Sequence, residues 1–172
     1  MADVYTVVFS LIGMLLSLPA LLVAINLLLP KVTQRIQTRL KETPGKSFVM
    51  GVPVTAVIIF WVLLTIEAGA GPIQATAFIV GGFGMVLGTL GAAGMARLLG
   101  ERIMPLSQPN SSMTNLVRGA VVFELACLFP LVGWFVFAPF VGMTVLGAAV
   151  FALLGWLPKR EVEEQITVVG NQ

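Results

Sequence analysis

Histidine is absent from this chain, and its only cysteine is Cys127. Without imidazole, the chain has no ordinary ligand for zinc, haem or chlorophyll, and no general base that titrates near neutral pH. A single thiol excludes an intrachain disulfide and a thiolate cluster. Serine-nucleophile motifs of the Gly-x-Ser-x-Gly kind are also missing. We therefore expect no enzyme activity, no cofactor and no metal, although a site made of carboxylates alone stays open.

Charged residues are also few: they make up only 10% of the 172 residues, whereas 58% are hydrophobic. A soluble domain usually carries about 25% charged residues. So few charges cannot cover a water-facing surface, which predicts that lipid covers much of it. The fold class expected from residues 1–172 is all-α, a single integral membrane bundle of helices. No nucleic acid is expected as a partner.

Long apolar runs mark the expected transmembrane helices, since about 20 apolar residues cross the hydrocarbon core. Three full spans are predicted at about 5–29, 48–66 and 75–95. The first is read as a retained span and not as a signal peptide, because no basic residue precedes it. The last apolar stretch, 119–157, is too long for one crossing.

The positions of lysine and arginine indicate how that last stretch is arranged. All ten basic residues fall in the segments 30–47, 97–118 and 158–172. Cytoplasmic loops collect such residues. They share one side only if 119–157 doubles back, as short helices over 119–136 and 140–157 or as a re-entrant hairpin. This predicts about five helices in a bacterial inner membrane, with the N-terminus outside and the C-terminus cytoplasmic.

Between the first two spans, Pro30 to Gly45 has the pattern of a short amphipathic helix. Such a helix is suited to the headgroup layer, where each basic residue near an anionic leaflet contributes about 1 kcal/mol. These residues either fix the topology alone or bind anionic lipid headgroups or a protein partner. The basic residues concerned are Lys31, Arg35, Arg39, Lys41 and Lys46.

The third span is rich in glycine, with Gly84, Gly88 and Gly91 on one helical face and Gly81 one turn earlier. Small residues let membrane helices approach closely. We therefore interpret Gly81, Gly84, Gly88 and Gly91 as helix-packing positions, in preference to a pore lining.

Two polar residues lie within the apolar runs, Asn26 and Glu124. Asn26 is expected to hydrogen-bond a neighbouring helix. An intramembrane carboxylate costs a few kcal/mol unless it is paired. For Glu124 the readings are an ion pair with Arg118 or Arg97, an interfacial carboxylate, or a proton or ion relay.

Several short motifs resemble a recurring bacterial pattern. They are Leu29–Arg35 after the first span, Thr43–Phe48 before the second, Leu64–Ile66 with Gly71-Pro72, and Phe129–Trp134 followed by a glycine-containing helix. In this order they resemble the small membrane domain associated with bactofilin-type polymer-forming proteins. The resemblance covers roughly 29–156 and implies a non-catalytic membrane anchor or scaffold. The soluble β-helical polymer domain is absent, and 67–71 is more polar and glycine-rich than the pattern.

Three functions follow as hypotheses. The first is a scaffold, anchor or accessory subunit of a larger bacterial membrane assembly, with lipid and other membrane subunits as partners. A special form is a peripheral subunit of a photosynthetic or respiratory complex. The third is a small channel or transporter that uses Glu124.

Overall fold

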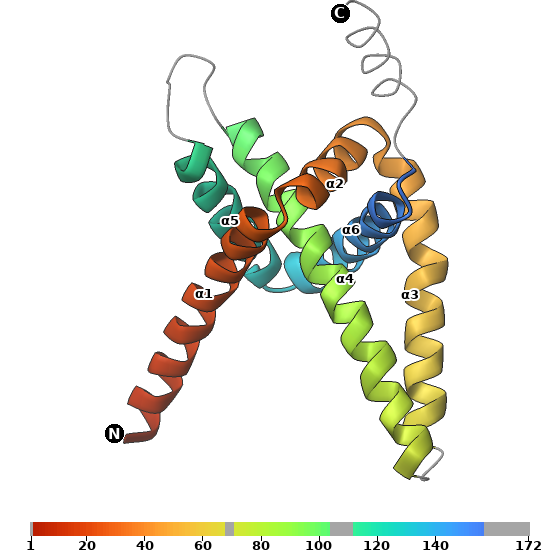
Figure 1. The fold of residues 1–172 in the computed structure, drawn as a ribbon. Helices are drawn as coiled ribbons and strands as arrows, with labels where there is room; N and C mark the ends of the chain where they lie inside the picture. Colours follow the sequence, from red (N-terminus) through yellow and green to blue (C-terminus); the bar gives the residue numbers. More distant parts are fainter. Residues whose placement is uncertain (1, 68–70, 104–111, 157–172) are drawn as a thin grey trace, which may run out of the picture.

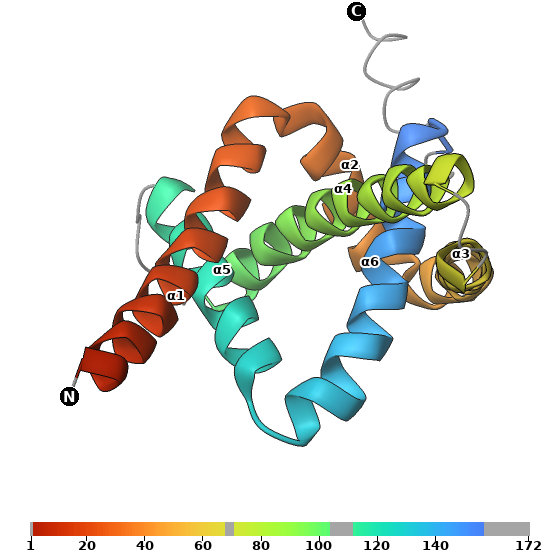
Figure 2. The same cartoon turned by 90° about the horizontal axis from the view of Figure 1, so that it is seen from below.

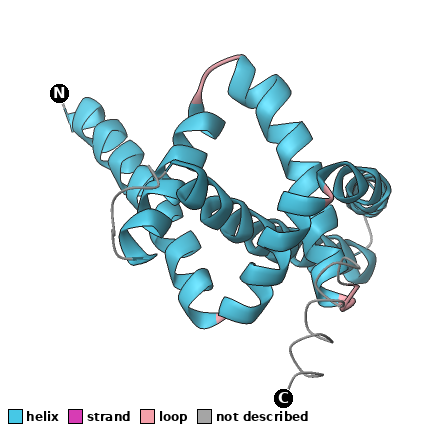
Figure 3. Cartoon of the chain, turned by 90° about the horizontal axis from the view of Figure 1, so that it is seen from above, coloured by secondary structure: helices cyan, strands magenta, loops and turns pink. Residues whose placement is uncertain are grey.

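The computed structural model describes residues 2–67, 71–103 and 112–156, and within these ranges every element is a helix. Figures 1 and 3 show the arrangement, in which α1 and α3 lie on opposite sides of the molecule. The elements are α1 (Ala2–Leu28), α2 (Pro30–Glu42), α3 (Pro44–Glu67), α4 (Gly71–Ile103), α5 (Ser112–Leu128), η1 (Gly133–Phe137, a π-helix) and α6 (Ala138–Leu153). The expected C-terminal segment 158–172 lies outside the described residues.

The expected all-α class is confirmed for the described residues, and four helical segments among them are long and apolar enough to cross a membrane. They are Tyr5–Leu28, Pro44–Glu67, Gly71–Ile103 and the continuous Gly133–Leu153. The fifth expected crossing is not among them. Its place is taken by α5, whose 17 residues span about 25 Å at 1.5 Å per residue, short of the roughly 30 Å hydrocarbon core.

The C-terminal apolar stretch doubles back between α5 and η1. The turn lies at 129–132, earlier than the expected break at 136–140, so the predicted ranges 119–136 and 140–157 differ from the observed helices. Pro130 has no N–H to continue the helix, and Leu131 takes a left-handed φ of 67°. Pro139 instead lies in the first turn of α6, directly after the π-helix η1, and does not reverse the chain. In Figure 1 this turn lies well above the lower ends of α3 and α4, in the manner of a re-entrant hairpin.

Helix α4 forms the centre of the structure and contacts α1, α2, α3, α5 and α6. Figure 2 shows it crossing between the α1–α5 pair and the α3–α6 pair. The main core cluster consists of Ile36, Leu40, Leu87, Leu90, Leu98, Val145, Ala148, Ala149 and Ala152. It lies where α2 and α6 pack against α4, in the half of the molecule that holds the α1–α2 connection.

Backbones meet closely at glycines in three helix crossings. A Cβ added at Gly147 of α6 would overlap the Ser47 backbone oxygen of α3, and one at Gly119 of α5 would overlap the Ala96 oxygen of α4. In the third crossing, Gly91 of α4 faces the backbone of Val145. Lipid gives helices no hydrophobic reason to associate, so such close packing supplies much of the attraction.

The other three glycines expected to pack in the third span, Gly81, Gly84 and Gly88, have different surroundings in the structure. A Cβ at Gly84 would lie 3.2 Å from the Ile58 side chain, and one at Gly81 would lie 3.6 Å from Val62, both on α3. At Gly88 it would meet nothing within 4 Å. The glycine face of α4 therefore contacts α3 and α6 at separate points, and a packing role for Gly88 stays a prediction.

Candidate functional site

Asn26 joins α1 to α4 near the end of the first span. Its Nδ2 donates to the backbone oxygens of Leu22 and Ala93, each at 2.9 Å. The residue is 4% exposed, and its Oδ1 has no hydrogen-bond partner. The structure thus places Asn26 in a hydrogen bond with a neighbouring helix, while its side-chain oxygen accepts no hydrogen bond.

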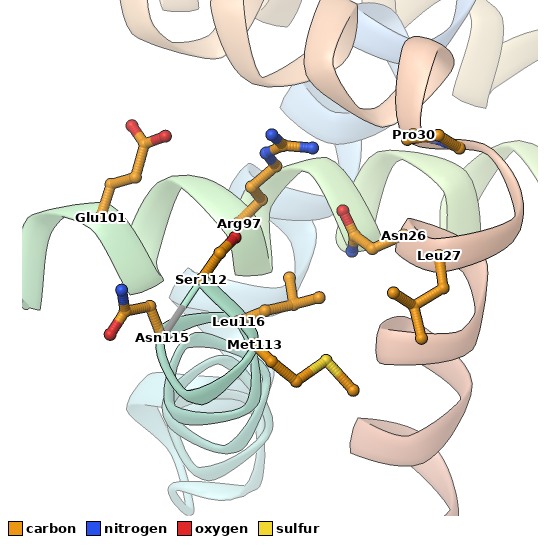
Figure 4. Close-up of a pocket in the computed structure, with 9 residues that line it drawn as sticks. All are labelled: Asn26, Leu27, Pro30, Arg97, Glu101, Ser112, Met113, Asn115 and Leu116. Carbon is orange, nitrogen blue, oxygen red and sulfur yellow. The ribbon is translucent and has the colours of Figure 1, made fainter. Parts of the chain in front are cut away.

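Asn26 lines a pocket of about 570 Å³ between α1, α4 and the first turn of α5, although its oxygen is covered by protein. We call it the polar pocket because five of its nine lining residues are polar. Figure 4 shows the Asn26 amide and the Arg97 guanidinium extending toward the same region from α1 and α4. No hydrogen bond or ion pair of Arg97 is present among the described residues. The lining residues are Asn26, Leu27, Pro30, Arg97, Glu101, Ser112, Met113, Asn115 and Leu116.

Glu124 lies in a second, mostly apolar groove of about 450 Å³ along the same two helices, α1 and α5. The residue is 5% exposed and its Oε1 has no partner. Neither of the expected partners reaches it: Arg97 lines the polar pocket, and Arg118 lies on the exposed side of α5. The ion-pair interpretation of Glu124 is therefore not realised in the described part of the chain.

Four of the five basic residues expected to form an exposed face are exposed, and one is buried. Lys31, Arg35, Lys41 and Lys46 are exposed, whereas Arg39 is 7% exposed and its guanidinium carbon lies 5.1 Å from the centre of the Phe151 ring. This geometry allows a cation–π interaction that ties α2 to α6. Arg39 thus contributes to packing, while the other four remain available to lipid or a partner.

One face of helix α2 is covered by protein. Thr33 and Ile36 are fully buried, and Ile36 lies against Gly94 of α4. Its apolar stripe therefore meets protein where the sequence predicts lipid. The amphipathic pattern was a correct sign of a helix with one buried face, but it could not distinguish what covers that face.

The sequence did not predict the pocket or the groove. Asn26, Arg97 and Ser112 are far apart in the chain, and no local pattern marks them as neighbours. The available signals were single polar residues near the ends of apolar runs. Among the described residues no group of three or more His, Cys, Asp and Glu side chains is placed to hold a metal ion.

No family model, no curated protein and no solved structure matches this chain. The resemblance to the membrane domain associated with bactofilin-type proteins therefore stays a hypothesis based on its short motifs.

Proposed function

We propose that this chain is a non-catalytic membrane scaffold or accessory subunit of a larger bacterial membrane assembly. The observation that supports this most is the uncovered first helix. Only 12% of the most apolar window of α1, and 11% of that of α3, is buried within the chain. Large side chains in the outer half of α1, such as Tyr5, Phe9 and Leu16, are 62%, 72% and 66% exposed.

The arrangement of α1 favours a protein neighbour over lipid alone. In Figures 1 and 2 its N-terminal half diverges from the other helices, beyond the point where α4 and α5 contact it. Gly13 lies in this half, and a Cβ there would meet nothing within 4 Å. A glycine on an unpacked transmembrane helix leaves a notch into which a second helix can pack closely.

The orientation belongs to the same proposal. All Lys and Arg residues of the described ranges lie in α2, at the start of α3, at the end of α4 or in α5. These segments gather at one end of the molecule (Figure 1). By the positive-inside bias this end is cytoplasmic and the N-terminus is outside, in a bacterial inner membrane.

Gly13→Leu is expected to disrupt assembly without disturbing the chain's own fold. The leucine fills open space and is a better helix former than glycine, by up to about 1 kcal/mol in water, so the free energy of unfolding should not fall. Purification from native membranes in mild detergent, followed by mass determination, should show the wild type in a defined complex and the variant alone. Gly82→Leu, at an equally open position on α4, is the matched control and should stay in the complex. A wild-type chain that runs alone as a monomer contradicts the proposal.

Glu124 favours a second candidate, a small channel or transporter. A carboxyl that is 5% exposed, has an unpartnered oxygen and borders an apolar groove is the arrangement expected of an intramembrane ion or proton site. In liposomes, Glu124→Gln should then abolish proton or cation flux, whereas Glu101→Gln at the helix end should preserve it. A wild-type protein without measurable flux removes this candidate.

A further inference from the structure

The polar pocket and the apolar groove follow each other along one seam between α1 and α5. On α1 the groove is lined by residues from Leu15 to Val23, and the pocket begins at Asn26. On α5 the order matches, because the pocket ends at Leu116 and the groove begins at Val117. The seam therefore changes from polar to apolar along its length, as a phospholipid does.

The length of the seam also fits one lipid leaflet. From Asn26 to Leu15 the helix rises about 17 Å at 1.5 Å per residue. Half of the hydrocarbon core is about 15 Å. The polar end lies beside the α1–α2 connection, at the basic end of the molecule where headgroups would be (Figure 1). The apolar end leads toward the centre of the bilayer.

The charges of the pocket select the kind of headgroup. Among the described residues the Arg97 guanidinium forms no hydrogen bond or ion pair, and the first turn of α5 presents the positive end of the helix dipole. Both favour a phosphate. The Oδ1 atoms of Asn26 and Asn115 are buried without partners, and Glu101 adds a carboxylate to the lining. Of these groups the exposed Glu101 carboxylate is the one that a headgroup can reach, and it favours a cationic hydrogen-bond donor, which a phosphate does not offer.

The geometry points to a bound aminophospholipid, with its phosphate at Arg97 and the α5 N-terminus, its primary ammonium at Glu101, and an acyl chain in the α1–α5 groove. The oxygens of Asn26 and Asn115 are covered by protein and are assigned no contact with the headgroup. Glu124 lies deep in the groove, and the headgroup does not supply its missing partner. This site is independent of the proposed scaffold function and needs no protein partner.

The test is native mass spectrometry of the delipidated protein in detergent, titrated with phosphatidylethanolamine, phosphatidylcholine or phosphatidylglycerol of identical acyl chains. Phosphatidylcholine keeps the phosphate and the chains but has no N–H. We expect phosphatidylethanolamine to bind about tenfold more tightly than phosphatidylcholine, as the loss of one or two hydrogen bonds to a charged group implies. Equal affinity for these two lipids, or tighter binding of phosphatidylglycerol, overturns the proposal.

Variants locate the binding in the pocket. Arg97→Gln should lower the affinity for phosphatidylethanolamine about tenfold, as expected for the loss of one charge-assisted contact. Glu101→Gln should reduce the preference over phosphatidylcholine. Arg102→Gln, on the same helix but outside the pocket, is the control and should bind as the wild type does. Helix content by circular dichroism shows that each variant is folded, and undiminished binding by folded Arg97→Gln contradicts the assignment.

Discussion

Replacing Gly147 with alanine is expected to destabilise the protein by about 3 kcal/mol, because overpacking a closely packed contact has costs of this size. The added methyl would overlap the Ser47 backbone oxygen and lie 2.7 Å from the Gly51 nitrogen. Both neighbours are backbone atoms of α3, so they cannot move aside as a flexible side chain could. The crossing between α3 and α6 would have to separate along its length.

The free energy of unfolding can be measured by adding sodium dodecyl sulfate to the protein in mild detergent and following ellipticity. Gly142→Ala is the matched control, since it lies on the same helix and its added methyl meets nothing within 4 Å. Alanine is also the better helix former, by about 1 kcal/mol in water. The control should therefore be neutral or stabilising. Equal stability of the two variants would mean that α3 and α6 do not cross at Gly147.

These crossings show what the sequence could and could not predict. Apolar runs of transmembrane length predicted the long helices, because helical backbone is the only open-ended structure that satisfies its hydrogen bonds in lipid. The same runs are apolar on all sides, so periodicity cannot mark the packed face. Gly51, Gly119 and Gly147 were not distinguished from the other glycines in advance. Their role depends on which backbone lies opposite, and that is a property of the folded chain.

The C-terminal hairpin was predictable only in outline. The distribution of basic residues predicted that the chain returns within 119–157, and this stretch contains two prolines, Pro130 and Pro139. Which break is used depends on the whole turn. Pro139 is accommodated in the first turn of α6, whereas Pro130 and the left-handed Leu131 reverse the chain. Proline interrupts a helix interior but is favoured at its start, so a proline alone does not locate the turn.

For the candidate site, the sequence identified polar residues but not their neighbours. Asn26 was expected to bond another helix, and it donates to Ala93 of α4. For Glu124 an ion pair with an arginine was one of three interpretations, and in the described residues it lies in the groove without one. A side chain can be placed at a depth by counting residues from the end of a span. Its direction depends on how the helix is rotated, which the nearly uniform apolar sequence does not set.

The seating of α2 can be tested through the contact between Ile36 and Gly94. Ile36→Ala should cost about 3 kcal/mol, since it removes a fully buried side chain and leaves a cavity. Gly94→Ala should also destabilise, because its methyl would overlap the Ile36 side chain and lie 3.3 Å from the Thr33 oxygen. In the double variant the closest overlap, with Cγ2 of Ile36, is gone, whereas the Cβ at position 36 stays 2.8 Å from the new methyl, so the relief is partial. The double variant should therefore lose about 1–2 kcal/mol less than the sum of the single losses.

Detergent unfolding of the single and double variants measures this coupling. Gly88→Ala combined with Ile36→Ala is the control, since a methyl at Gly88 contacts nothing and its effect should add to that of Ile36→Ala. The two possible positions of α2 give opposite results. If α2 lies in the headgroup layer as its basic amphipathic pattern alone suggests, Ile36 faces lipid and the cycle with Gly94 is additive. If α2 packs on α4, the coupling is present. The same packing of α2 then holds Arg39 over the Phe151 ring.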